Sequence, residues 1–134
     1  MNNVLATLNS LWRDVGILGK FVTDKNWEEG KISISYLNKS VGLYKAVLGE
    51  EVVYIGKGTE WNNGGLRKRL RDYVRENDSA RNCPSASNMF KNKDKIHIQV
   101  LIVGDGEDSV NTTECLEKLF IKEDNPKWNK LDNN

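Results

Sequence analysis

Two tyrosines, Tyr44 and Tyr54, stand ten positions apart in two β-rich segments, residues 41–48 and 51–56. The glycine-containing stretch between the segments, residues 48–50, indicates a hairpin turn. Strand side chains alternate between the two faces of a sheet, so a three-residue turn would set the tyrosines opposite each other on one face. Their hydroxyl groups could then meet at one oxygen atom of a ligand.

A basic helix is predicted to follow the hairpin. Residues 66–75 carry apolar side chains at helical spacing, and Arg69 and Tyr73, four positions apart, share a face of that helix. The guanidinium group is planar and always charged, and it donates hydrogen bonds in a fork, which suits a phosphate group. We therefore expect Arg69 to reach across the hairpin toward an anionic ligand.

One acidic side chain falls where a helix should be apolar. Residues 111–122 predict a helix that begins at a capping-box pair, Asn111 and Glu114, and a helical wheel places Glu117 within its apolar arc. A buried carboxylate is costly without a partner, so Glu117 needs an arginine, a proton or a metal ion. Just past this helix, a proline and a tryptophan precede the amide of Asn129.

The order and spacing of these residues resemble the signature of the GIY-YIG nuclease superfamily. The matching residues are Gly42-Leu43-Tyr44, Tyr54-Ile55-Gly56, Lys57, Arg69-Leu70, Tyr73, Glu117, Pro126 and Asn129. Over residues 41–129 the chain is similar to the nuclease half of the bacterial excision-repair incision subunit and to small stand-alone phage endonucleases.

Two features depart from the family pattern. Leu43 is a mild change at the middle of the first motif, and residues 59–65 are longer than in the repair subunit. The longer stretch makes Arg67 a rival for the arginine role, but the register of Leu70 and Tyr73 favours Arg69. Residues before 37 match nothing in the pattern.

The resemblance implies a role for each matching residue of the hairpin and the basic helix. Tyr44 resembles the residue that activates water or relays its proton, and Tyr54 resembles the tyrosine that orients the water or the phosphate. Lys57 would support the proton transfer. Arg69 would stabilise the pentavalent phosphate, and Tyr73 would hydrogen-bond at the scissile group.

The same resemblance makes Glu117 the sole protein ligand of a Mg²⁺ or Mn²⁺ ion and Asn129 the amide that buttresses the site. One Mg²⁺ ion needs few protein ligands because it keeps most of its waters. A tyrosine of ordinary pKa, near ~10, is a poor base at neutral pH. We therefore expect Lys57, Arg69 and the metal ion to lower the pKa of Tyr44.

Regular elements must position this set. The patterns predict a helix over residues 5–18, the hairpin, a helix over 66–75, a strand over 95–103 and a helix over 111–122, with a candidate strand at 31–36. Residues 77–87 read as a polar loop and 124–134 as an extended tail. The predicted fold is α+β, a three-stranded antiparallel sheet flanked by helices (GIY-YIG type) with an N-terminal helical extension. We expect residues 1–40 to pack on a nuclease core of residues 41–134.

The net charge is only +1, but the bases are concentrated in one part of the sequence. Residues 66–95 hold nine bases against four acids, which suits a polyanionic partner, although a solvated helix face would have the same composition. The bases expected to follow a nucleic-acid backbone are Arg67, Lys68, Arg71, Arg75, Lys91 and Lys93.

The composition is that of an ordinary single-domain protein of 134 residues. No apolar run approaches the ~20 residues that cross a bilayer, and the first residues lack the features of a signal peptide. Cys83 and Cys115 lie far apart and predict free thiols in a reducing compartment. We therefore expect a cytoplasmic protein without a membrane partner, and the sequence leaves monomer and homodimer open.

The function that the sequence favours is a DNA endonuclease that uses one divalent ion. An RNase of the same mechanism and a catalytically silent nucleic-acid-binding module are the alternatives. The intact set of Tyr44, Arg69 and Glu117 argues against the silent module. The choice between DNA and RNA, the target sequence and the biological role stay open at this level.

Overall fold

The computed structural model describes residues 3–21, 37–74 and 83–132. Its centre is an antiparallel sheet of four strands in the order β1-β4-β2-β3. The strands are β1 (Arg13–Ile17), β2 (Val41–Leu48), β3 (Glu51–Gly58) and β4 (His97–Gly104). The helices are α1 (Asn3–Asn9), α2 (Leu18–Phe21), α4 (Gly65–Asp72), α5 (Pro84–Lys91), α6 (Val110–Asp124) and α7 (Lys127–Leu131). The predicted α+β class is confirmed, but the sheet has four strands rather than three.

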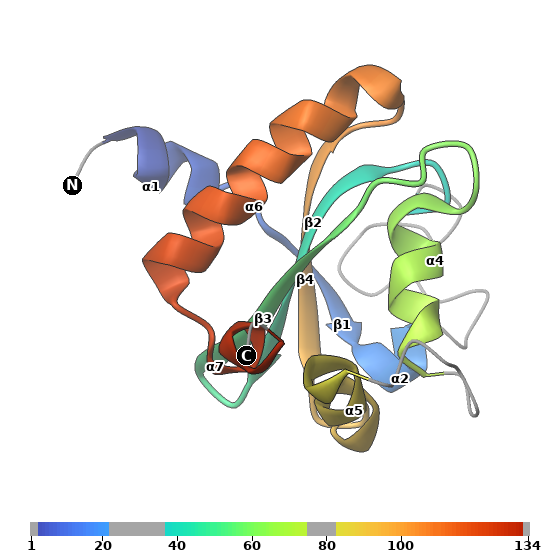
Figure 1. Ribbon diagram of the computed structural model, residues 1–134, viewed down its shortest axis with the longest axis vertical. Helices are drawn as coiled ribbons and strands as arrows, with labels where there is room; N and C mark the ends of the chain where they lie inside the picture. The colour runs from blue at the N-terminus through green and yellow to red at the C-terminus, as the bar shows by residue number, and fades with distance from the viewer. Residues whose placement is uncertain (1–2, 22–36, 75–82, 133–134) are drawn as a thin grey trace.

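The helices lie on both sides of the sheet (Figure 1). On one side α6 and the segment of α1 pack over Leu43, Ile55 and Leu101. On the other side α4 and α5 cover the face that carries Tyr44 and Ala46. Because β3 is an edge strand, groups on the two faces of the sheet can approach each other around it.

The fourth strand corrects the predicted helix over residues 5–18. Only its first half is helical, as α1, while β1 pairs with β4 antiparallel. A bulge in β1 allows this pairing, with Gly16 at φ 105° and its N–H donating to Asp14 Oδ1 at 3.0 Å. Pairing with the open edge of β4 gives these residues a ladder of backbone hydrogen bonds. The stabilisation from that ladder outweighs the local preference for a helix that their apolar spacing indicates. The division into residues 1–40 and 41–134 stays a prediction, although residues 13–17 belong to the central sheet.

The hairpin is confirmed, but its turn is shorter than expected. Leu48 pairs with Glu51, so the turn has two residues, and a bulge follows Ala46. As a result Tyr44 stands opposite Gly56, and Tyr54 stands opposite Ala46. The two tyrosines are therefore diagonal neighbours on one face of the sheet rather than a directly opposed pair.

Three further predictions about the elements are wrong. Residues 84–91 form α5, which begins with Pro84 at its first position, where a proline costs no hydrogen bond. Residues 127–131 form α7 rather than an extended tail. Helix α6 begins after Ser109 without a side-chain cap, so the predicted capping box is absent. The candidate strand at residues 31–36 lies outside the described residues.

Candidate active site

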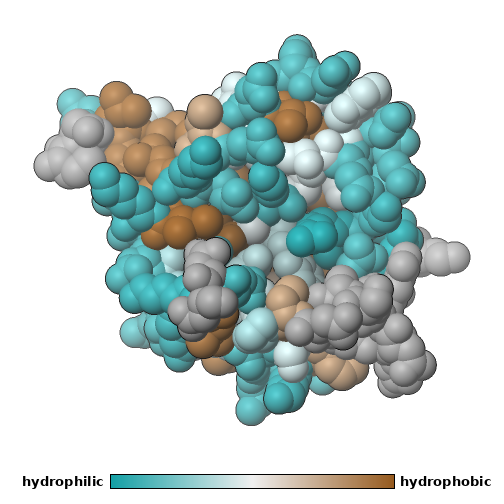
Figure 2. All heavy atoms as spheres, in the orientation of Figure 1, coloured by the Kyte–Doolittle hydropathy of each residue, from teal (hydrophilic) through white to brown (hydrophobic). Residues whose placement is uncertain are grey.

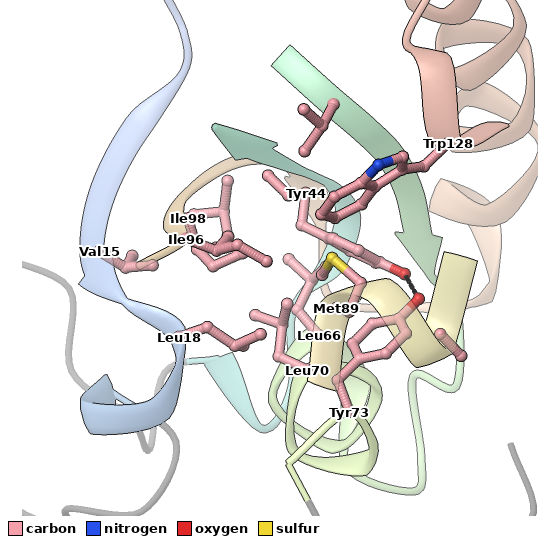
Figure 3. Packing of buried hydrophobic residues seen from close by; sticks show 14 of the residues in the cluster. Val15, Leu18, Tyr44, Leu66, Leu70, Tyr73, Met89, Ile96, Ile98 and Trp128 are labelled. Atoms are coloured by element: carbon pink, nitrogen blue, oxygen red, sulfur yellow. Dashed lines mark hydrogen bonds between the residues drawn. The ribbon is translucent and has the colours of Figure 1, made fainter. Parts of the chain in front are cut away.

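Three tyrosine hydroxyl groups gather between the sheet and α4. The Tyr44 and Tyr73 hydroxyls hydrogen-bond to each other, as Figure 3 shows. The Tyr44 ring lies 6.2 Å from the Tyr54 ring and 5.9 Å from the Tyr73 ring, measured between centroids. Tyr44 is fully buried and Tyr73 nearly so, whereas Tyr54 is half-buried. The structure thus brings together all three predicted tyrosines.

Gly56 makes room for this cluster. The phenol of Tyr44 lies directly over the Gly56 Cα, where a Cβ atom would overlap the ring. Glycine in a strand commonly marks such a close approach. The neighbour that needs the space is a side chain of the protein itself, the phenol of Tyr44.

Burial raises the pKa values of all three tyrosines. For Tyr44 the largest cause is desolvation, followed by the charge of an ionised Tyr54, and these outweigh Arg69 and the hydrogen bonds that would stabilise a phenolate. The pKa of Tyr73 is also raised by desolvation first, and so is that of Tyr54. Arg69 lowers the Tyr44 pKa as expected, but burial outweighs it, so the net shift without a bound cation is upward rather than downward.

Arg69 reaches the tyrosine cluster from α4. The pKa of Arg69 is raised, chiefly by the attraction between its guanidinium group and Tyr44. Arg69 also lines a hollow of about 210 Å³ between the end of β3 and α4, together with Lys57, Lys68 and Asp72. Its rival Arg67 instead donates to Asn38 Oδ1 at 3.3 Å. The structure places Arg69, and not Arg67, beside the tyrosines.

Glu117 faces β3 from the other side of the sheet. Its side chain is 20% exposed, and desolvation is the first cause that raises its pKa, followed by the attraction of Lys57, which lowers it. Lys57 Nζ lies 3.0 Å from Glu114 Oε2 and 3.8 Å from Glu117 Oε1. Arg69 also lowers the pKa of Glu117. Charged groups on the two faces of the sheet therefore interact around the edge strand.

The residues present fit a single divalent cation. Two carboxylates, Glu114 and Glu117, converge on the ammonium group of Lys57, which shows that a positive charge is stabilised at this position. Within residues 3–21, 37–74 and 83–132, no group of three or more His, Cys, Asp or Glu side chains is placed to hold a metal ion. An ion here would depend on Glu117 and on water, as suits Mg²⁺.

Asn129 clamps the edge strand. Its Oδ1 accepts from the Ile55 backbone N–H at 2.9 Å, and its Nδ2 donates to the Ile55 carbonyl at 2.8 Å. Asn129 thereby occupies the place of a further strand beside β3, between the positions of Tyr54 and Gly56. Asn129 therefore holds the backbone of the strand that carries Tyr54.

Two residues that the sequence analysis did not select adjoin the cluster. Ser85, buried at the start of α5, lowers the pKa of Tyr54 against the larger effect of burial. The Ser85 hydroxyl and backbone N–H both donate to the carboxylate of Asp132, which follows α7. The only local signal was Pro84, which could have indicated the start of a helix at Ser85.

The predicted nucleic-acid-binding bases are dispersed. Lys68 lines the same hollow as Arg69 and pairs with Glu60 at 2.6 Å. Lys93 lies over the Phe90 ring, and Lys91 is exposed at the end of α5. Arg67 and Arg71 are half-buried on α4, and Arg75 lies outside the described residues.

The surface differs between the two sides of the molecule. The region over α4 is mainly hydrophilic, whereas hydrophobic residues gather near α1, where Val4 and Leu11 are exposed (Figure 2). Among the described residues no helix has the length and apolar character needed to cross a membrane. The hollow lined by Arg69 lies on this hydrophilic side, beside α4.

Comparison with known proteins gives a structural likeness only. No protein-family model and no curated protein matches the chain. The GIY-YIG N-terminal endonuclease domain of UvrC from Thermotoga maritima, bound to magnesium as its catalytic divalent cation, matches with a TM-score of 0.50 and 21% identity over 71% of this chain and 89% of that one. An asparagine-to-alanine point mutant of the same domain, also cation-bound, matches with a TM-score of 0.49 and 21% identity over 71% of this chain and 88% of that one. Together with the four-stranded sheet and the hairpin that carries Tyr44 and Tyr54, this likeness shows that the chain has a GIY-YIG nuclease-like fold.

Proposed function

We propose that this protein is a metal-dependent endonuclease that hydrolyses phosphodiester bonds in DNA. The observation that carries the proposal is the convergence of the tyrosine cluster and Arg69 on one side of β3 with Glu117 on the other. Phosphodiester hydrolysis needs a group that takes a proton from water, a cation that stabilises the charged phosphate and help for the leaving oxygen. The site offers one candidate for each requirement.

The phosphate is proposed to enter the hollow beside Arg69. Arg69 and Lys68 present positive charge there, and Lys57 lies at the same hollow from β3. The guanidinium of Arg69, which lines the hollow, would neutralise charge that grows in the pentavalent transition state. Tyr44 would take the proton of the attacking water, while Tyr54 and Tyr73 hold that water and the scissile group in line.

Glu117 is proposed to hold the divalent cation, with Glu114 close by and Lys57 displaced from between them. The cation supplies Lewis-acid stabilisation of the phosphate and of the leaving oxygen. Lys57, once released, supports the proton transfer near the hollow. Asn129 keeps Tyr54 and Gly56 in place through the Ile55 backbone.

DNA is the proposed substrate, with RNA as the second candidate, because the phosphate chemistry is shared. Lys91 and Lys93 are proposed to contact the backbone of the nucleic acid, which gives binding that weakens with salt. Specificity for sequence would then be modest.

The test is a cleavage panel with supercoiled plasmid, single-stranded DNA and RNA, each with Mg²⁺, Mn²⁺ or EDTA. We expect metal-dependent nicking of the plasmid, reduced at least ~100-fold in Glu117→Gln and in Arg69→Ala, because each removes charge stabilisation in the transition state. Exposed residues of the same types serve as matched controls, with Glu107→Gln and Arg13→Ala expected to cleave normally.

Each alternative outcome of the cleavage panel would change one part of the proposal. Cleavage of RNA alone would replace the DNA substrate with RNA. Binding of plasmid without cleavage in either metal would show a silent binding module. Equal activity of Glu117→Gln and the wild-type protein would remove the metal-site assignment.

A further inference from the structure

The loop between β3 and α4, residues 59–64, exposes an aromatic ring (Figure 1). The side chain of Trp61 is 38% exposed, although tryptophan is highly buried on average. Two other tryptophans show the usual behaviour, since Trp12 packs edge-on against Phe120 and Trp128 lies in the core. Trp61 therefore presents apolar surface that the fold itself does not use.

Hydrogen bonds hold the backbone of this loop in one shape. The Trp61 N–H donates to the Thr59 carbonyl at 2.9 Å, and the Gly65 N–H donates to the Glu60 carbonyl at 3.0 Å. The Glu60 carboxylate pairs with Lys68 Nζ at 2.6 Å and so fastens the loop to α4. A ring on such an ordered loop can bind a ligand at a small cost in conformational entropy.

The loop also forms one wall of the hollow that holds Arg69. Thr59 and Glu60, the two residues before Trp61, line that hollow together with Lys57. Consecutive Cα atoms lie about 3.8 Å apart, so the Trp61 backbone is one residue from this wall. A nucleic acid with a phosphate in the hollow would therefore bring a neighbouring base close to Trp61.

The surroundings of Trp61 favour a base over an apolar protein surface. Docking sites for proteins gather apolar residues in one patch, but Val4, Leu11 and Leu131, the other exposed large hydrophobic residues of the described chain, lie on or next to α1 and α7. The surface over α4 is mainly hydrophilic (Figure 2), and Asn62 beside Trp61 is exposed. A lone aromatic ring beside basic side chains is typical of proteins that bind single strands, because bases stack on the ring while the cations follow the backbone.

We propose, on the basis of the proposed nuclease function, that Trp61 is a stacking platform for an unpaired nucleobase beside the scissile phosphate. A base inside a matched duplex is already stacked on its neighbours and must be unstacked before it can meet the ring. The platform therefore selects DNA that is single-stranded or locally unpaired. Every base has a π-face, so this selection tolerates any sequence.

The first experiment measures binding of a single-stranded DNA oligonucleotide in EDTA, where the nuclease reaction does not proceed. We expect the Kd of Trp61→Leu to rise about 5- to 100-fold, because leucine is apolar but has no aromatic face. Trp61→Phe should keep most of the affinity, yet lose most of the quenching of tryptophan fluorescence that the oligonucleotide causes in the wild-type protein. Asn62→Ala, the next exposed position of the loop, is the matched control and should stay within about twofold of the wild-type Kd.

Two comparisons separate stacking from a lost charge contact or a disturbed loop. The slope of log Kd against log salt concentration should be the same in Trp61→Leu and the wild-type protein, because stacking releases no counterions. An oligonucleotide with abasic sites in place of its bases keeps the phosphate charges, so the wild-type protein and Trp61→Leu should bind it equally.

The second experiment measures cleavage with Mg²⁺ of a duplex that contains an unpaired bubble and of the same duplex fully matched. We expect the wild-type protein to have a severalfold higher kcat/KM on the bubble. Trp61→Leu should lose this preference and cleave the matched duplex at the wild-type rate. Urea unfolding shows whether each variant is folded under the assay conditions.

The outcomes distinguish the platform from the nuclease activity. A wild-type protein that nicks DNA, together with unchanged binding and unchanged bubble preference in Trp61→Leu, would overturn the platform and leave the proposed function intact. An equal loss of affinity for the normal and the abasic oligonucleotide would also overturn it, because Trp61 would then only support the loop. Binding that depends on Trp61, with no cleavage in Mg²⁺ or Mn²⁺, would overturn the nuclease function and leave the platform as a binding site for unpaired DNA.

Discussion

Replacing Asn129 by alanine removes the two hydrogen bonds that fasten the edge strand at Ile55. The bonds measure 2.9 and 2.8 Å, and both Ile55 backbone groups are part-buried, so their loss leaves one donor and one acceptor poorly satisfied. Each such bond contributes roughly 0.5–1.5 kcal/mol, which predicts a loss of about 2 kcal/mol in the free energy of unfolding. For a domain of this size that loss corresponds to a fall of about 6–10 °C in Tm.

Urea unfolding followed by circular dichroism measures this loss directly. The slope of the free energy of unfolding with urea should stay unchanged, because the substitution does not alter the surface exposed on unfolding. Asn62→Ala, in an exposed part of the loop before α4, is the matched control and should stay within about 0.5 kcal/mol of the wild-type protein. A stability of Asn129→Ala equal to that control would refute the clamp.

The clamp also predicts an effect on activity. Ile55 lies between Tyr54 and Gly56, so a loosened strand displaces the tyrosine cluster. We expect Asn129→Ala to lose activity mainly in kcat even at temperatures where it is folded, because small misplacements of reacting groups are costly. Full activity together with reduced stability would confine Asn129 to a structural role.

Three other results are expected. Gly56→Ala forces a Cβ against the Tyr44 ring and should cost about 1–3 kcal/mol in urea unfolding, and an unchanged stability would contradict the close contact. Lys57→Met removes the ammonium group that competes with a metal ion for Glu117. Mg²⁺ should therefore half-saturate the enzyme at a severalfold lower concentration, while kcat falls. A higher Mg²⁺ requirement would disprove the competition. In the folded protein the pKa values of the three described tyrosines are raised above 10.0. Their contribution to the free energy of unfolding is therefore full below pH 10 and is lost as pH rises above it. Absorbance at 295 nm should show their ionisation only together with alkaline unfolding.

The sequence by itself determined the hairpin, the basic helix, the last long helix and the identity of the residues that meet beside β3. These features depend on local rules, because alternation defines a strand, helical spacing defines a helix, and a carboxylate within an apolar arc must have a partner. For that reason Tyr44, Arg69 and Glu117 could be selected before any coordinates.

Only the tertiary structure decided the features that depend on distant partners. Residues 13–17 became a strand because β4 had an unpaired edge, although their spacing is helical. The bulge after Ala46 changed which residue faces Tyr44, and burial reversed the expected direction of the Tyr44 pKa. Ser85 and Asp132 joined the cluster across 47 residues, a contact that no local pattern predicts because chain folding alone brings the ends of α5 and α7 together.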